Sequence, residues 1–351
     1  MIELRTNGKK IINYSQVDIT LSLDTVASTF SFDGYFDINN EATKELYKPF
    51  TYKKADVWFI DENLGINEKL ITGIILNQAP SLQKKPQLTN LSGYSVTGIL
   101  EDISVPPELY PLESQGLGLA EITRKFTKYL GLKLKVFDNA IQATSIPFEK
   151  AKAKPGETIK SYLSNLCKVR NITLTHDNLG RLLLYRVLAK VPPAAKIDEN
   201  DNNISISIAP NGQGMHSHIT VIRQSEFDDL NAGQYTIRSP FVPTGTIRPL
   251  VKILTFGEND DVKAMAEAEA CREAKNFPIV IEKEGWTIGN KLVRAGFYLE
   301  VTAPSIFLER IKLVIQTINF KEDKENGRRM RIICVHPCVY TGVLPKKSPF
   351  K

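Results

Sequence analysis

Residues 116–136 read GLGLAEITRKFTKYLGLKLKV and residues 154–177 read KPGETIKSYLSNLCKVRNITLTHD, and these two stretches decide the fold. Each begins with a short amphipathic helix pattern, stops at Gly131 or Asn171, and continues directly into an alternating strand pattern. No residue type that carries catalysis occupies the same position in both stretches. The pattern therefore predicts a twice-used helix-and-strand unit that serves for docking and not for chemistry.

Two proline pairs mark the ends of the segment that contains both copies. Pro106-Pro107 follows a β-like region, and two consecutive prolines cannot continue a strand ladder. Pro192-Pro193 precedes the polar run at 198–203, which is the clearest linker in the chain. Residues 106–192 are therefore predicted to form an α+β insert domain with the order helix, strand, helix, strand, strand.

Regions with strand patterns flank this insert on both sides. Residues 1–105 contain short alternating runs separated by polar turns, which predicts a first β-barrel domain. Residues 193–351 are predicted to form a second β-barrel domain with one Ala-rich helix at about 260–276. The predicted fold class is mainly β with an α+β insert, in which two small β-barrel (tube-type) domains flank the helix-strand-helix-strand-strand domain.

The composition is that of an ordinary folded protein. The 351 residues are 42% hydrophobic and 24% charged, with a formal net charge of +6. Lys and Arg are scattered and form no dense basic tract, so nucleic-acid binding is not implied. Four cysteines are too few for a disulfide framework in a chain of this length. The chain has neither a signal-peptide pattern nor an apolar run of about 18 residues, so we expect no membrane-spanning segment.

A metal site is the first kind of chemistry to consider. Cys334, His336 and Cys338 would share one face of a strand with period-two alternation. Zinc takes four ligands, commonly from two separated pairs, and the other cysteines occur singly. His216 and His218 follow a Gly/Asn/Gln loop and are interpreted as a solvated or interface pair. We therefore predict no metal ligand.

Catalytic and cofactor motifs are also incomplete. The pairs Glu101-Asp102 and Asp228-Asp229 would face opposite ways on a strand, so neither forms an acid/base couple. The chain contains no nucleophile elbow of the Gly-x-Ser-x-Gly type before a helix. Gly116-x-Gly118 lacks the third glycine of a dinucleotide loop. We predict no catalytic residue, no cofactor and no enzymatic activity.

Taken in order, several phrases resemble the baseplate hub proteins of Mu-like contractile-tailed phages, a family related to the hub domains of type VI secretion spikes. They are SGYSVTGILED at 92–102, the two helix-and-strand stretches, DNLGRLLL at 177–184, the Ala-rich helix with Arg272, EGW at 284–286 and the hairpin around Asn326-Gly327. The resemblance covers most of the chain. Its signature positions, which we interpret as structural, are Gly93, Thr97, Gly98, Asp102, Pro155, Gly156, Glu157, Gly285 and Trp286.

The resemblance implies a virion structural protein. Such hubs are homotrimers in which two β-barrels per chain make a pseudo-sixfold ring between the hexameric tail tube and the trimeric spike. The implied partners are other copies of the chain, the tail tube protein, the central spike protein, baseplate wedge proteins and the tape-measure protein. Genomic DNA would pass through the bore without sequence readout. The implied location is the tail baseplate of the virion, after assembly in the host cytoplasm.

Three alternatives stay open at this point. Tail proteins sometimes carry a cell-wall-degrading activity, such as that of a muramidase. A type VI or other contractile injection system uses a related hub, although those chains usually fuse the hub to a long β-helical spike. The distal tail hub of a siphophage, whose tail is non-contractile, shares the same architecture.

Overall fold

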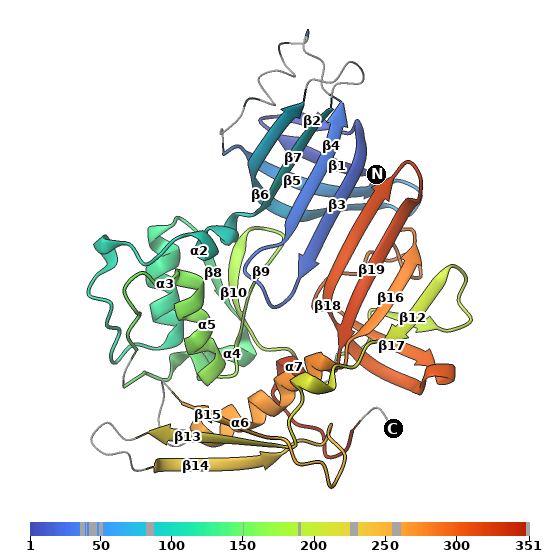
Figure 1. Ribbon diagram of the computed structural model, residues 1–351. Helices are drawn as coiled ribbons and strands as arrows, with labels where there is room; N and C mark the ends of the chain where they lie inside the picture. The colour runs from blue at the N-terminus through green and yellow to red at the C-terminus, as the bar shows by residue number, and fades with distance from the viewer. Residues whose placement is uncertain are drawn as a thin grey trace.

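The structure is a computed structural model that describes residues 1–35, 39, 41, 48, 52–81, 88–149, 151–188, 191–224, 231–254 and 261–348 (Figure 1). The strands are β1 Ile2–Thr6, β2 Lys9–Ile11, β3 Tyr14–Ser22, β4 Thr29–Tyr35, β5 Lys54–Asp61, β6 Ile66–Ser81, β7 Leu88–Ser95, β8 Lys133–Val136, β9 Thr173–His176, β10 Arg181–Tyr185, β11 Ala195–Asp198, β12 Ile204–Ile208, β13 His218–Gln224, β14 Asn231–Arg238, β15 Pro249–Ile253, β16 Ile279–Glu284, β17 Tyr298–Ala303, β18 Leu308–Asp323 and β19 Gly327–Val335. The α-helices are α2 Ile99–Asp102, α3 Leu119–Tyr129, α4 Asp138–Ser145, α5 Ile159–Val169, α6 Asp261–Arg272 and α7 Cys338–Thr341. The 3₁₀ turns are η1 Val96–Gly98, η2 Pro107–Leu109, η3 Gly212–Gly214, η4 Glu273–Asn276 and η5 Pro304–Ile306. In these ranges, every helix is too short or too polar to span a membrane.

One large sheet joins the beginning of the chain to its end. Among the described residues it has thirteen strands, in the order β12-β16-β19-β18-β3-β4-β7-β6-β5-β1-β2, with β17 paired to β18 and β11 paired to β17. β3 and β18 pair antiparallel in the middle of this order, with Ile19 opposite Phe320 and Leu21 opposite Ile318. Figure 1 shows the blue β3 beside the red β18 and β19 at this pairing.

Side chains from both halves of the chain fill one apolar core. Val17 and Ile19 of β3 and Ile318 and Phe320 of β18 are buried in the same cluster, as period-two alternation dictates when one face of a sheet is covered. Because this burial supplies the main favourable free energy of folding, the two halves stabilise each other.

The insert forms a separate small layer. Its three strands run in the order β8-β10-β9, and apolar residues of α3 and α5 pack in one cluster with the strands. The aromatic rings of Phe126 and Tyr162 meet edge-on at 6.0 Å between the two helices. Both helix-and-strand copies turn at a left-handed residue, Gly131 with φ +65° and Asn171 with φ +52°. The predicted helices, stops and strands of the two copies are therefore confirmed.

A second small layer lies against the insert. Strands β14, β13 and β15 form a three-stranded sheet, and α6 packs against β13 and β14. Val221 of β13 and Ala266 of α6 belong to the same apolar cluster as the insert helices. The guanidinium of Arg272 also donates to the backbone carbonyl of Lys168 at the end of α5, at 3.0 Å. β13 and α6 thus contact the insert, and Cys271 of α6 shares another apolar cluster with Val314 of β18 and Val335 of β19.

The predicted fold class, mainly β with an α+β insert, is confirmed. The described strands of the two predicted barrels pair mainly in one continuous thirteen-stranded sheet, and no ring of strand pairs closes among them. The alternating pattern that begins at Leu88 indicates a strand as far as residue 100, but β7 ends at Ser95, where η1 and α2 begin; β1, β14 and α4 were not predicted. The division into domains at 105 and 192 stays a prediction.

Trp286, which follows β16, packs between strands of the two halves. Its ring meets Phe59 of β5 edge-on at 5.8 Å between centroids and Phe320 of β18 at 6.3 Å. Its Nε1–H donates to the backbone carbonyls of Lys321 and Arg329 at 3.1 and 3.2 Å. The single indole N–H therefore bridges two backbone carbonyls of the β18–β19 hairpin, while the ring fills the shared core.

The two tryptophans give a matched test of this role. Trp286→Phe keeps most of the apolar volume but removes the one N–H that two backbone carbonyls share, so we expect the free energy of unfolding to fall by about 1–3 kcal/mol. The Nε1 of Trp58 is buried without a partner among the described residues, so Trp58→Phe should cost clearly less. Urea denaturation followed by circular dichroism measures both, and equal losses would contradict the assigned role.

Candidate assembly sites and structural signature

The first signature consists of Gly93, Thr97, Gly98 and Asp102. It begins where the backbones of β6 and β7 approach too closely for a side chain. A Cβ on Gly93 of β7 would lie 1.9 Å from the carbonyl oxygen of Ile74 on β6. Two residues after β7 ends, Thr97 is fully buried, and its hydroxyl donates to the carbonyl of Val26 at 2.5 Å. Gly93 and Thr97 therefore fix the point at which the chain leaves the large sheet.

Tyr94 organises the rest of this signature. Its ring covers Gly98, where a Cβ would lie 2.5 Å from the ring, and its hydroxyl donates to the carboxylate of Asp102. Burial and this hydrogen bond to Asp102 together raise the pKa of Tyr94. Gly98 and Asp102 thus share one local role, which is to hold the first helical turns after β7.

The second signature, Pro155 to Glu157, is the turn before α5. Gly156 has φ +79°, a left-handed conformation that favours glycine. The Glu157 carboxylate accepts from the backbone N–H of Lys154 at 3.0 Å and from the hydroxyl of Ser161 at 2.8 Å. The turn and the first turn of α5 are therefore held by a single side chain.

These two signatures, about 55 residues apart in sequence, meet in the structure. The N–H of Val105 donates to the carbonyl of Glu157 at 3.2 Å, and the N–H of Ile159 donates to the carbonyl of Ile103 at 3.1 Å. The exit from the large sheet is thereby joined to the start of the second helix-and-strand copy. The sequence did not predict this meeting, because neither phrase carries a periodic signal for it.

The third signature, Gly285-Trp286, lies apart from the other two. Gly285 has φ +80°, and its N–H donates to the carbonyl of Arg328 at 2.8 Å. This turn after β16 directs Trp286 into the core shared by the two halves. All nine signature positions thus occupy turns, close approaches or packing contacts, and their interpretation as structural positions stays a prediction.

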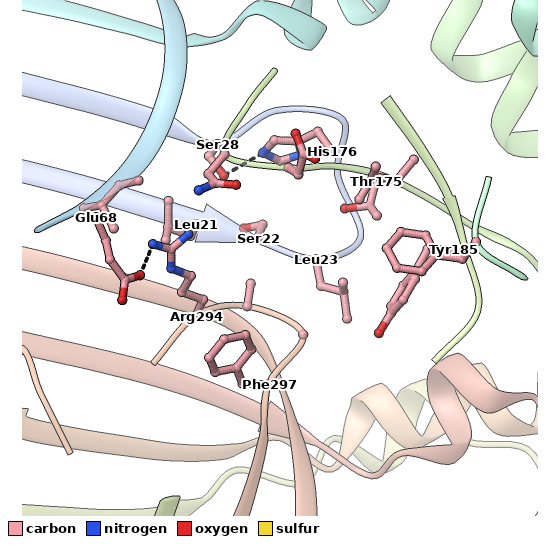
Figure 2. A pocket seen from close by; sticks show the side chains of 17 residues that line it. Leu21, Ser22, Leu23, Ser28, Glu68, Thr175, His176, Tyr185, Arg294 and Phe297 are labelled. Atoms are coloured by element: carbon pink, nitrogen blue, oxygen red, sulfur yellow. Dashed lines mark hydrogen bonds and ion pairs between the residues drawn. The ribbon is translucent and has the colours of Figure 1, made fainter. Parts of the chain in front are cut away.

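A cleft of about 430 Å³ opens where the insert faces both halves of the large sheet. Leu23, just after β3, Tyr185 of β10 and Phe297, just before β17, line it from three parts of the chain, as Figure 2 shows. Arg294 and Glu68 form an ion pair across its wall. The cleft therefore has several apolar side chains in its lining, and the charges of Arg294 and Glu68 in its wall neutralise each other.

His176 closes one side of this cleft. Its ring nitrogens contact the hydroxyl of Ser28 at 2.8 Å and the carbonyl of Thr25 at 3.0 Å, both in the β3–β4 connection (Figure 2). Burial lowers the pKa of His176, so the ring is neutral near pH 7. Its contacts tie the insert to the connection between the first strands.

The turn after His176 completes this attachment. The side-chain amide of Asn178 donates to the carbonyl of Lys69 at 2.9 Å, and its backbone carbonyl accepts from the hydroxyl of Thr72 at 2.8 Å. Asn178 is therefore bound to β6 through both its side chain and its backbone. Gly180, at φ +73°, lies so close that a Cβ would approach Val96 at 2.6 Å. The sequence predicted the turn as a hairpin connection, but not its docking on β6.

The Cys334–Cys338 segment differs from its predicted geometry. β19 ends at Val335, and Cys338 begins α7, so the three side chains do not share a strand face. Cys334 and Cys338 are buried in different apolar clusters. Within the described ranges, no group of three or more His, Cys, Asp or Glu residues could hold a metal ion.

The remaining polar candidates are engaged in structural contacts. Glu101 and Asp102 lie in α2 and not on a strand, and Glu101 pairs with Lys160 at 2.6 Å. His216 pairs with Glu273 at 2.6 Å, which attaches the η3 region to the end of α6. The pair Asp228-Asp229 lies outside the described residues.

No family model matches the chain, and no curated protein matches it in sequence. Among solved structures, the 43 kDa tail protein of prophage MuSo2 from Shewanella oneidensis superposes with a TM-score of 0.77 at 22% identity, covering 98% of this chain and 99% of that one. A tail protein from Neisseria meningitidis gives 0.79 at 17% identity, with the same coverage. This chain has the fold of phage tail proteins.

The same tail-protein fold extends to secretion systems. An Escherichia coli component of the type VI secretion system, described as structurally similar to the T4 tail proteins gp27 and gp5, has a TM-score of 0.58 at 8% identity. That match covers 99% of this chain and 80% of the E. coli chain. The expected hub-like fold is therefore confirmed over the full length of the chain.

The close approach at Gly93 gives a sharp test of the first signature. Gly93→Ala would place a Cβ against a backbone carbonyl, so we expect a loss of at least about 3 kcal/mol in the free energy of unfolding, or failure to fold. Gly212→Ala is the matched control, because a Cβ there meets nothing within 4 Å. Thermal unfolding compares them, and a stable Gly93→Ala protein would contradict the assigned constraint.

His336 predicts a loss of stability on acidification. Burial lowers its pKa from 6.5 to about 4, and its Nδ1 accepts from the backbone N–H of Cys338 at 3.2 Å. The unfolded chain binds the proton more tightly, so stability is full above pH 6.5 and is lost as the pH falls toward 4. Between about pH 7 and pH 5 the loss should be about 2 kcal/mol.

His336→Asn isolates this contribution, because the asparagine oxygen can still accept the hydrogen bond but does not titrate. Urea denaturation at neutral and mildly acidic pH measures the difference. The variant should lose about 2 kcal/mol less than the wild type over that interval. An unchanged pH dependence would show that His336 does not carry it.

Proposed function

We propose that this protein is the structural baseplate hub of a phage tail. Three copies would form a pseudo-sixfold ring that joins the hexameric tail tube to the trimeric spike and forms part of the DNA ejection channel. The observation that carries the proposal is the full-length fold likeness to two phage tail proteins, with TM-scores of 0.77 and 0.79. The sequence phrases at 92–102, 154–158 and 284–286 point to the same family.

The architecture suits a subunit that presents strands from both halves to its neighbours. The large sheet ends in the edge strands β12 and β2, whose outer backbone groups make no strand pair among the described residues. Unpaired edges are templates for association, and neighbouring subunits of a ring can cover them. Ring closure requires heterologous contacts, in which different surfaces of each copy meet.

The charge distribution suits a channel that conducts DNA without retaining it. The net charge is +6, and many basic side chains near the β18–β19 hairpin are paired, as Lys321 is with Asp18 at 3.0 Å and Arg329 with Asp323 at 2.8 Å. Paired cations neutralise fewer phosphates, so non-specific binding is weaker. The partners in this proposal are other copies of the chain, the tail tube protein, the spike, wedge proteins and the tape-measure protein.

The role would be structural and not enzymatic, at the tail baseplate of the virion. The signature residues lie in turns and packing contacts, and His176, His216, Glu101 and Asp102 all make contacts within the described part of the chain. Zymography on peptidoglycan tests this point. A cleared band at the mass of this protein would contradict the structural role.

The likeness to the E. coli type VI component favours one second candidate, the hub of a contractile injection system. Mass spectrometry of purified particles separates the two functions. Presence of this protein in particles that also contain capsid protein supports the phage tail. Presence only in tail-like particles without capsids supports the injection system.

The oligomeric state is the direct test of the hub. We expect the purified chain to form a species of about three times 39.4 kDa, seen by sedimentation velocity, and a threefold ring in negative-stain images. The fraction of trimer should rise with protein concentration, as mass action requires. A strict monomer at high concentration, alone and with tube or spike protein, would overturn the proposal.

A further inference from the structure

The turn between β17 and β18 carries an exposed aromatic side chain in an unfavourable backbone conformation. Phe307 is 78% exposed and has φ +66°. Glycine adopts this left-handed region without steric strain, whereas a bulky residue with a Cβ does so at a cost in free energy. Neither burial nor local geometry in the isolated chain accounts for phenylalanine at this position.

The rest of the turn is held rigidly, so the ring projects from a fixed base. The carboxylate of Glu199 accepts from the N–H and the hydroxyl of Ser305 at 3.1 and 3.0 Å. Ile306 packs against the main apolar core. A rigidly presented aromatic loses little conformational entropy on binding, which is the property of an interface anchor.

The other end of the same strand borders the cleft of Figure 2. β17 runs from Tyr298, next to the cleft residue Phe297, to Ala303 near the turn. Its six residues span about 20 Å at roughly 3.3 Å each, so Phe307 cannot reach the cleft of its own chain. Phe307, which we call the knob, and the cleft thus lie at opposite ends of one strand. This arrangement is suited to head-to-tail association.

The free charges beside the two features are opposite in sign. Glu309 next to the knob is exposed and makes no ion pair with any described residue, whereas its neighbour Arg310 pairs with Glu300 at 3.6 Å. At the cleft, Lys135 lies over the ring of the cleft residue Phe137 at 4.6 Å and likewise has no carboxylate partner in the described ranges. The knob thus carries an unpaired acid and the cleft an unpaired base.

We propose that the Phe307 turn of one copy seats in the cleft of the next copy, with Glu309 approaching Lys135 across the interface. This contact rests on the proposed ring and supplies its heterologous interface. The phenyl ring would pack among Leu23, Tyr185 and Phe297. Because that site is formed by three separate parts of the chain, the inserted ring would also brace the insert against the large sheet.

Phe307→Gly tests the contact without threatening the fold, because glycine relieves the left-handed strain. We expect the melting temperature to stay the same or rise, while the association constant measured by sedimentation velocity falls at least tenfold. Asn290→Gly is the matched control: Asn290 is also exposed with φ +60°, but it lies outside the turn and the cleft lining. The control should associate as the wild type does.

The outcomes separate this contact from the ring itself. A trimeric Phe307→Gly protein would overturn the contact and leave the hub proposal standing. A monomeric wild type at high concentration would overturn both. An open chain of copies that Phe307→Gly abolishes would support the contact and contradict the closed ring.

A charge reversal tests the pairing independently. Glu309→Lys and Lys135→Glu should each weaken association, and the double variant should recover most of it, since the pair is restored with its signs exchanged. Both side chains are exposed, so the fold should tolerate the changes. A double variant that associates no better than either single variant would overturn the docking of this turn in this cleft.

Discussion

The antiparallel pairing of β3 with β18 is the constraint on which the rest of the structure depends. It joins residues about 300 positions apart, Asp18 to Lys321 and Ile19 to Phe320, and makes one sheet from the two ends of the chain. Closing so long a loop costs conformational entropy that only a large buried surface can offset. The shared core supplies that surface, with Val17, Ile318 and the ring of Trp286 buried in the same cluster. The insert, which lies between the two strands in sequence, is therefore held by a sheet whose halves are not independent.

A few polar contacts, most of them to backbone groups, fix the position of the insert on that sheet. The chain leaves β7 at Gly93, and the stretch at 103–105 then pairs with the start of α5. In the turn after β9, the side-chain amide and the backbone carbonyl of Asn178 both bind β6. These attachments are polar and specific in geometry, so they fix orientation more than they add stability. The cleft of Figure 2 lies where these parts meet, beside the small apolar cluster that Leu23, Val187 and Tyr298 share.

Local patterns predicted most elements, because period-two and helical periodicities are written along contiguous residues. The helices at 119–129 and 159–169, their left-handed stops and the final hairpin follow from such patterns. β1 was not predicted, although Ile2 and Leu4 are fully buried, because five residues at a terminus carry too short a signal. Nor does any local pattern encode the partner of β3. The signature phrases could be recognised from the sequence, but the meeting of Val105 with Glu157 is a tertiary contact with no sequence period.

The signature positions indicate why such a fold persists at low sequence identity. Gly93 has no room for a side chain, and Gly156 and Gly285 have left-handed backbone. Core positions accept many apolar residues of similar volume, whereas a backbone approach of this kind accepts only glycine. A full-length likeness at 17–22% identity is the expected result of such constraints. Phe307 runs against this rule, since it places a large side chain where glycine would be free of strain, and the proposed contact with a second copy would give that side chain a role.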